Sequence, residues 1–369
     1  MTAARLVARC VSGLETDVIE EILAGGLGVV TRVGRRSVEF ATDRLDAGVL
    51  GLRTADDVFL VAGRAPDVGH TRDGLGALGG LARAADLGRP AWSRPGGGIA
   101  GFSGVAGVSG VEVSASFLGR RNFNRYDAED AVGAVLAERL GVPYHSRRGG
   151  AAPPEGCAGW RLVLDGAHAT LMARVAARPL HRRDYKRRTV PGTLHPPVAA
   201  AMARLAAPRP GELVVDPCCG AGTLLIEARL TQPLARLQGY DLDPGALAAA
   251  RANAGGDPRI ALRRADAARL PLPDASVDVV LANPPWGGQV APGGALAAAP
   301  ERWWAELARV LCPEGRAVVL VPDTAGLAVA IRHGLLPSHL RHLAISGAHP
   351  HVVVLRTARA RAKHPAGKK

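Results

Sequence analysis

One stretch, residues 213–228, constrains the fold of this 369-residue chain more than any other. A short apolar run at residues 212–215 is typical of a buried strand and ends in a turn that contains Gly220 and Gly222. Helix-forming residues follow at 224–229. A strand, a glycine turn and a helix place backbone N–H groups and a helix N-terminus beside one pocket. Because glycine has no side chain, a ligand can lie directly against this turn.

The residues around the turn indicate which ligand the pocket holds. A dinucleotide fingerprint, G-x-G-x-x-G, would place its third glycine at position 225, where this chain has Leu225. Asp216, at the strand end, would repel a phosphate but can pair with an ammonium group. S-adenosylmethionine carries an ammonium and a sulfonium and no phosphate. The turn therefore favours S-adenosylmethionine and disfavours a nicotinamide oxidoreductase.

Three further predicted strands, later in the chain, also end in a polar residue. Asp241 follows Asp216 by 25 positions and can accept both hydroxyls of a ribose. Asp266 marks a third strand end, and Asn283 a fourth, directly after the apolar run 277–282. The expected cofactor site consists of residues at these four strand ends: Asp216, Cys218, Gly220, Gly222, Asp241, Leu242, Asp266, Ala267 and Asn283.

The segment Asn283-Pro-Pro-Trp286 suits methyl transfer to an amine on a nucleobase. The lone pair of such an amine is delocalised into the ring, so an acceptor for its N–H groups raises the electron density on nitrogen and orients it. The side-chain oxygen of Asn283 and the carbonyl of Pro284 can both accept, while Trp286 can stack a flipped-out base. Asn283, Pro284 and Trp286 are therefore the expected catalytic residues. Adenine N6 and guanine N2 both remain open as acceptors at this point.

The order of these motifs resembles that of the class I S-adenosylmethionine-dependent methyltransferases, and Asn283-Pro-Pro-Trp286 resembles the tetrapeptide of those that methylate a nucleobase nitrogen. The run Asp216-Pro-Cys-Cys-Gly-Ala-Gly-Thr223 is similar to that of RNA guanine-N2 methyltransferases that carry a THUMP domain. This resemblance implies a C-terminal Rossmann-like α/β domain with a doubly wound sheet. Intact residues at all four strand ends disfavour the alternative, a catalytically inactive RNA-binding protein.

Composition and charge indicate the partner and the compartment. The formal net charge of the chain is +13 at pH 7, and many of its basic residues are clustered. Both features favour a polyanionic partner. No apolar run approaches the ~20 residues of a membrane span, and Arg5 and Arg9 interrupt any signal-peptide pattern. Five irregularly spaced cysteines favour a reducing cytoplasm. Adjacent Cys218 and Cys219 cannot both ligate zinc comfortably, so no metal site is expected.

The N-terminal part begins with the pattern of a small α+β module and continues with a less regular stretch. Residues 1–64 predict a ferredoxin-like β-α-β-β-α-β order, whose second helix would run from Thr42 or Asp43 to Leu52. We interpret this part as structural. Within 65–110, which is rich in Gly, Ala and Pro, residues 74–86 favour a helix and 94–110 a loop. The later elements expected are a strand at 111–117, a helix at 129–140 capped by Asp127, and a hairpin of strands 160–164 and 169–175.

Two basic clusters are the candidate RNA contacts. In residues 119–126, arginines interleave with aromatic and asparagine side chains, which suits phosphate contacts and base stacking. A denser basic run at 178–188 lies between the N-terminal half and the methyltransferase half. The expected RNA-binding residues are Arg120, Arg121, Arg125, Arg182, Arg183, Lys186, Arg187 and Arg188.

The resemblance extends to this half through residues 13–15, 52–56, 120–130 and 181–186, which look like segments of THUMP-containing RNA methyltransferases. It implies guanine-N2 methylation of RNA by a monomer, with tRNA favoured over rRNA. The expected domains are a ferredoxin-like domain (1–64), a THUMP RNA-binding domain (65–184), a basic linker with a lead-in helix (185–205), the Rossmann-like methyltransferase domain (206–357) and a disordered basic tail (358–369).

Overall fold

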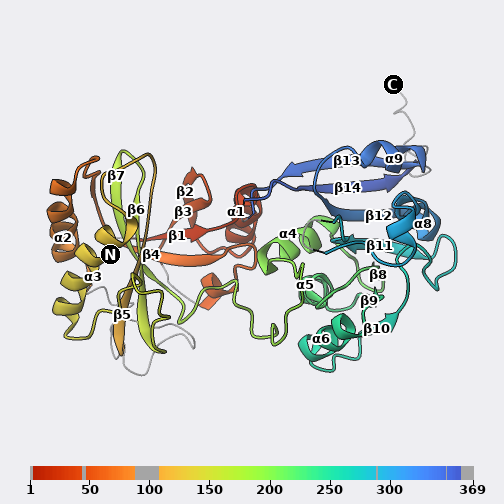
Figure 1. Ribbon diagram of the computed structural model, residues 1–369, viewed down its shortest axis with the longest axis horizontal. Helices are drawn as coiled ribbons and strands as arrows, with labels where there is room; N and C mark the ends of the chain where they lie inside the picture. Colours follow the sequence, from red (N-terminus) through yellow and green to blue (C-terminus); the bar gives the residue numbers. More distant parts are fainter. Residues whose placement is uncertain (1–2, 44–46, 88–107, 288–289, 346, 359–369) are drawn as a thin grey trace. The chain divides into compact units, whose positions relative to one another are not determined.

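The computed structural model describes residues 3–43, 47–87, 108–287, 290–345 and 347–358 (Figure 1). The chain divides into two compact units. Unit 1 comprises residues up to Cys10 together with Glu15–Leu180, and unit 2 comprises Val11–Leu14 together with the chain from His181 onward. Apart from Ala358, the expected tail at 358–369 lies outside the described residues, as does most of the expected loop at 94–110.

Unit 1 is built on a seven-stranded sheet of order β2-β3-β1-β4-β7-β6-β5. Its strands are β1 (Ala4–Arg9), β2 (Val29–Gly34), β3 (Ser37–Thr42), β4 (Asp57–Pro66), β5 (Gly110–Phe117), β6 (Cys157–Leu164) and β7 (His168–Arg174). Its helices are α1 (Glu15–Ala24), α2 (Leu75–Ala84) and α3 (Arg125–Leu140), with short 3-10 helices at Ala47–Gly51 and Arg72–Gly74. All neighbouring strands are antiparallel except β5 and β6, which are parallel.

Three expectations for unit 1 differ from the structure. Within the described residues, the segment expected to form the second helix of the ferredoxin-like pattern contains a 3-10 helix at Ala47–Gly51, where Gly48 and Gly51 disfavour an α-helix. The boundary expected after residue 64 falls inside β4, whose residues 57–60 pair with β1 and whose residues 59–66 pair with β7. The two expected N-terminal domains therefore share one sheet. Helix α3 is capped by Asn124, not by Asp127, which occupies the third position of the same capping box.

Unit 2 is a doubly wound α/β domain, as expected. Its sheet has the order β10-β9-β8-β11-β12-β14-β13. The pairs from β10 to β12 are parallel, and β14 runs antiparallel to β12 and β13 on its two sides. The strands are β8 (Leu213–Asp216), β9 (Arg236–Asp241), β10 (Ile260–Arg264), β11 (Val277–Ala282), β12 (Leu311–Val321), β13 (Leu335–His342) and β14 (His351–Thr357). The helices are α4 (Pro196–Ala206), α5 (Thr223–Thr231), α6 (Pro244–Ala254), α7 (Ala295–Ala298), α8 (Arg302–Val310) and α9 (Leu327–Arg332).

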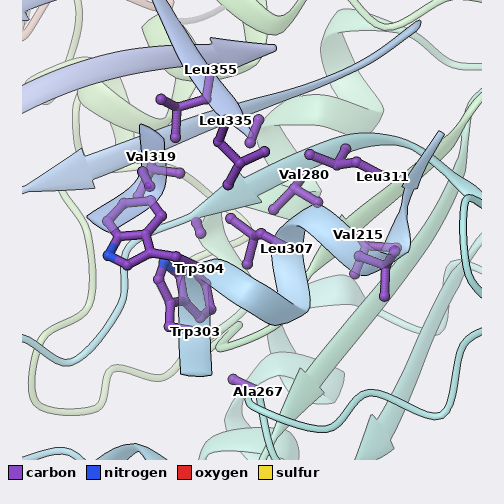
Figure 2. Packing of buried hydrophobic residues seen from close by; sticks show 14 of the residues in the cluster. Val215, Ala267, Val280, Trp303, Trp304, Leu307, Leu311, Val319, Leu335 and Leu355 are labelled. Atoms are coloured by element: carbon purple, nitrogen blue, oxygen red, sulfur yellow. The ribbon is translucent and has the colours of Figure 1, made fainter. Parts of the chain in front are cut away.

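Helices cover both faces of the unit 2 sheet (Figure 1). Helices α4, α5 and α6 lie on one face, where α4 packs against α5 and against β11, β12 and β14. On the other face, α8 places Trp303, Trp304 and Leu307 against the buried valines of the central strands (Figure 2). Burial on both faces explains why the central strands are continuous apolar runs.

No helix of the described part of the chain is long and apolar enough to cross a membrane. All five cysteines are free thiols.

Gly239, in the middle of β9, has no room for a side chain. A Cβ atom there would lie 2.5 Å from Leu225 Cδ1 and 2.7 Å from Leu262 Cδ2. We expect Gly239→Ala to destabilise unit 2 by about 1–3 kcal/mol through overpacking. Gly80 in α2 has open space around it, so Gly80→Ala should instead stabilise unit 1 by about 0.5–1 kcal/mol. Urea unfolding of both variants measures the two effects, and equal stability of Gly239→Ala and the wild type would contradict the packing argument.

Candidate active site

The four predicted strand ends meet at one edge of the unit 2 sheet. Strands β8, β9, β10 and β11 are parallel, and the strand order reverses between β8 and β11. In open α/β sheets, ligands bind outside the carboxyl ends of the strands at such a switch point. Asp216 and Asp241 are the last residues of β8 and β9, while Asp266 and Asn283 follow β10 and β11 directly or within two residues. The structure therefore brings these four side chains to the same edge.

The glycine turn between β8 and α5 adopts a conformation that requires glycine. Gly220 and Gly222 both have positive φ angles, 51° and 79°, and Gly222 is the N-cap residue of α5. A Cβ atom on Gly222 would lie 3.2 Å from the Cβ of Ala250 on α6. The turn is also tied to β9, because the N–H of Cys219 donates to the carbonyl of Tyr240 at 2.8 Å. Its backbone is thus held close to the sheet edge.

Asp216 is a buried carboxyl group with no cationic partner. Its side chain is 1% exposed, and one oxygen accepts from the N–H of Cys218 at 3.1 Å. No Lys, Arg or His of the described residues forms an ion pair with it. Burial raises the pKa of this carboxyl well above its ordinary value, and the nearby Asp241 raises it further. An ammonium group of a ligand would complete this site.

Asp241 and Asp266 are both oriented by backbone N–H groups. The two oxygens of Asp241 accept from Gly220 at 2.9 Å and from Asp243 at 3.0 Å, which fixes the carboxylate beside the glycine turn. The oxygens of Asp266 accept from Ala268 at 2.9 Å and from Ala295 at 2.8 Å.

Leu242 and Ala267 complete the predicted cofactor residues. Leu242 lies beside Gly294, where an added Cβ atom would come within 2.7 Å of Leu242 Cδ1. Ala267 is 5% exposed and belongs to the core under α8, so its side chain contributes packing. Cys218 is half-buried, its sulfur lies against the backbone N–H of Asn283, and burial raises the pKa of the thiol.

The Asn283-Pro-Pro-Trp286 segment presents two hydrogen-bond acceptors. Asn283 Nδ2 donates to the carbonyl of Gly192 at 3.2 Å, which orients the amide. Within the described residues, no hydrogen bond occupies Asn283 Oδ1 or the carbonyl oxygen of Pro284. Trp286 is half-buried, donates from Nε1 to the carbonyl of Leu320 at 2.8 Å, and stacks on Trp304 with ring centroids 5.9 Å apart. At most one face of this indole is left for a base.

Residues 187–193, expected to be a linker, are attached to the site by Asn253. This residue lies near the end of α6 and is 4% exposed. Its Oδ1 accepts from the N–H groups of Arg187 and Arg188, and its Nδ2 donates to the carbonyls of Arg188 and Ala221, all at 2.9 Å. Asn253 therefore joins the segment to the glycine turn. The local sequence pattern did not predict this role of Asn253.

A second buried group anchors the basic run that precedes this segment. Glu227 on α5 is 0% exposed and accepts from Arg183 Nε at 3.2 Å and from Tyr185 Oη at 2.7 Å. The side chain of Arg183 is 8% exposed, so it is a structural ion-pair partner and is not available to RNA as we had expected. The other predicted contacts in this run remain accessible: Arg182, Arg187 and Arg188 are exposed and Lys186 is half-buried.

The basic turn in unit 1 also contains both buried and exposed arginines. Arg121 has a side chain only 1% exposed; it pairs with both oxygens of Asp67 at 2.7 and 2.8 Å and lies against the rings of Phe117 and Phe123. Arg121 is therefore held in a buried ion pair within unit 1. Arg120 and Arg125 are exposed, and Arg125 stacks over the ring of Tyr126.

The residues at the sheet edge fit S-adenosylmethionine. Unpaired Asp216 suits the α-ammonium group, the glycine turn gives close approach to the backbone, and the Asp241 carboxylate retains lone pairs for ribose hydroxyls. No group of three or more His, Cys, Asp or Glu side chains in the described part of the chain is arranged to hold a metal ion. The strand order, with antiparallel β14 between β12 and β13, and this site define a class I methyltransferase.

Comparisons with known proteins identify the family. Residues 183–342 match the RMKL-like methyltransferase domain family. The chain is 33% identical to tRNA (guanine(6)-N2)-methyltransferase of Thermus thermophilus over 93% of its length and 96% of the relative. Over 34% of its length it is 35% identical to the Bos taurus U6 snRNA (guanine-N(2))-methyltransferase THUMPD2, of which the match covers 25%.

Solved structures agree. The crystal structure of TrmN from Thermus thermophilus matches with a TM-score of 0.74 at 30% identity, over 96% of this chain and 99% of that one. SMU.472, a putative methyltransferase complexed with SAH, matches in fold with a TM-score of 0.68 at 17% identity, over 97% and 99% of the two chains. The chain belongs to the THUMP domain-containing, S-adenosylmethionine-dependent RNA guanine-N2 methyltransferases.

Binding of S-adenosylhomocysteine should release protons from Asp216. The raised pKa keeps this carboxyl protonated at pH values where an ordinary aspartate is ionised, and the ligand ammonium favours the ionised form. Affinity should therefore increase with pH until the free protein is itself ionised. Calorimetry in two buffers of different ionisation enthalpy measures the release, which Asp216→Asn should abolish. Identical binding enthalpies in both buffers for the wild type would contradict this view of Asp216.

Proposed function

We propose that the enzyme methylates the exocyclic N2 amine of a guanosine in tRNA. The observation that carries this proposal is the combination of Asn283-Pro-Pro-Trp286 at the switch point with the alignment over 93% of the chain to an enzyme named for tRNA guanine-N2 methylation. The same alignment supports tRNA over rRNA. One chain carries both the cofactor site and the exposed basic residues, so the proposed working form is a monomer, acting in the cytoplasm where tRNA is found.

In the proposed mechanism, two hydrogen-bond acceptors orient the amine and one aromatic ring contacts the base. Asn283 Oδ1 and the Pro284 carbonyl accept the two N–H groups of the amine, which directs its lone pair and raises its electron density. Gly192 holds the Asn283 amide in place, and Pro285 stiffens the segment. Trp286, braced by Trp304, contacts the base. S-adenosylmethionine supplies an electrophilic methyl group on a sulfonium that leaves as a neutral thioether, so the protein needs no covalent nucleophile.

The proposed RNA surface contains the accessible basic residues of the two units. In unit 1 these are Arg120 and Arg125, and in unit 2 they are Arg182, Lys186, Arg187 and Arg188. Burial lowers the pKa of Lys186, and no carboxylate among the described residues pairs with its ammonium group. A phosphate contact would compensate this half-buried charge. We propose that residues 65–184 act as the THUMP RNA-binding part of the chain.

Nucleoside analysis tests the proposed reaction. Purified enzyme, S-adenosylmethionine and unmodified tRNA or rRNA should yield N2-methylguanosine in the digested tRNA, detected by liquid chromatography and mass spectrometry. N6-methyladenosine as the product, or methylation of rRNA alone, would overturn the proposal.

Asn283→Ala should separate catalysis from cofactor binding. The variant removes one of the two proposed acceptors, so single-turnover methyl transfer should fall by at least about a hundredfold, the usual scale for one oriented hydrogen-bonding group. Affinity for S-adenosylhomocysteine, measured by calorimetry, should change only modestly. Retention of more than half of the wild-type rate would assign the catalytic role to another residue.

A further inference from the structure

Helices α2 and α3 cover one face of the unit 1 sheet. On the other face, some of the arginine side chains form ion pairs with carboxylates and others do not. Side chains alternate along a strand, so Arg161 on β6 points away from its fully buried neighbours Trp160 and Leu162. These neighbours are on the side that faces α2, because Gly63 shares that side by register and a Cβ atom on Gly63 would lie 3.0 Å from Leu81 Cδ1 of α2. We call the side on which Arg161 lies the arginine face. By strand register it also carries Ser114 and Ser116 of β5, Met172 and Arg174 of β7, Phe59 and Arg64 of β4, and Arg5, Val7 and Arg9 of β1.

Three of the arginines on this face are neutralised by carboxylates. Arg5 and Arg64 donate to the two oxygens of Glu39, at 3.0 and 2.8 Å. Arg174 pairs with Asp57 at 2.7 Å and with Glu112 at 3.2 Å. These pairs cross between strands and account for the burial of their charges.

Arg161 has no carboxylate partner among the described residues. Its guanidinium forms hydrogen bonds with two hydroxyl groups, with Nη2 2.9 Å from Ser116 Oγ and Nη1 3.4 Å from Ser114 Oγ. Its Nε is buried and makes no hydrogen bond within the described part of the chain. Arg9, half-buried on the same face, also forms no ion pair with any described carboxylate. Two half-buried cations and two serine hydroxyls therefore share one face, and no carboxylate that the structure describes pairs with either cation.

This arrangement costs stability in the free protein. A buried cation without a counter-ion is unfavourable. Burial, together with the positive charges of Arg9, Arg36 and Arg147, lowers the pKa of Arg161 to about 10. Burial and the charge of Arg36 likewise lower the pKa of Arg9. Groups kept at such a cost are typical of binding sites, and the missing component here is an anion.

We propose that Arg161, Arg9, Ser114 and Ser116 form an anion site that binds a phosphate group of the RNA backbone. The planar guanidinium of Arg161 matches the geometry of phosphate oxygens, and the Ser116 hydroxyl supplies a further donor. The Ser114 hydroxyl already donates to the carbonyl of Trp160 at 3.3 Å, so it only helps to position Arg161. The identification of the phosphate as part of RNA rests on the proposed function. The site positions RNA without reading its sequence, because phosphate contacts carry no base information.

Arg161→Met tests the site in the full-length protein. It keeps much of the side-chain volume and removes a charge that has no ion pair. The affinity for full-length tRNA should fall roughly tenfold, and the slope of log affinity against log salt should become shallower by about 0.7–0.9 for one lost phosphate contact. The unfolding temperature should stay the same or rise, because a desolvated charge is lost. Arg83→Met is the matched control, since Arg83 is exposed on α2, which covers the other face.

The outcomes separate a binding role from a structural role. A lower unfolding temperature for Arg161→Met with wild-type tRNA affinity and salt slope would overturn the proposal. Inorganic phosphate distinguishes a free anion from RNA: it should raise the unfolding temperature of the wild type but not of Arg161→Met. Stabilisation by phosphate with no effect of the substitution on tRNA binding would overturn the assignment to RNA.

Binding is measured with S-adenosylhomocysteine present, so it does not depend on turnover. If the wild type methylates guanosine in tRNA but Arg161→Met binds tRNA normally, only this inference fails. If no guanosine is methylated but Arg161→Met weakens tRNA binding as expected, only the proposed reaction fails.

Discussion

The site depends on the four hydrogen bonds of one buried amide. Asn253 uses both acceptor positions and both donors to join residues 187 and 188 to Ala221 in the glycine turn. Each bond is worth about 0.5–1.5 kcal/mol on its own, and a buried polar group left unpaired costs more. The segment then reaches Asn283 through the carbonyl of Gly192. The cofactor turn and the catalytic tetrapeptide are thereby connected through a stretch that contributes no predicted catalytic residue.

Asp216 in unit 2 and Arg161 in unit 1 both lack a counter-ion among the described residues. Asp216 is a buried carboxyl group, and Arg161 is a half-buried guanidinium. Several other buried charges in the same units are paired, as in Glu227 with Arg183 and Glu39 with Arg64. The contrast indicates that folding alone does not require Asp216 and Arg161 to be charged. The α-ammonium group of S-adenosylmethionine fits the first group, and the proposed RNA phosphate would supply the anion at the second.

The sequence predicted the parts of unit 2 that follow from local pattern. Apolar runs gave its strands, with β11 predicted to the residue. Because parallel strands end at one edge, the meeting of Asp216, Asp241, Asp266 and Asn283 was also predictable. The merging of two expected domains into one sheet was not, since it depends on how β4 pairs beyond Gly63. The pairing of Arg121 with Asp67 was not predictable either, because these residues are 54 positions apart in the sequence. The same holds for the contacts of Asn253, whose partners are more than 30 positions away.

Residues 187–193 should support the active site through their connection to the glycine turn. The affinity of Asn253→Ala for S-adenosylhomocysteine tests this most directly. Alanine has a higher helix propensity than asparagine, so α6 itself should not be weakened. Calorimetry should show affinity at least about tenfold lower than that of the wild type, the loss of about 1.4 kcal/mol, while Arg251→Ala, an exposed change on the same helix, should bind normally. Wild-type affinity of a folded Asn253→Ala variant would contradict the account, because the glycine turn would then not depend on its connection to this segment.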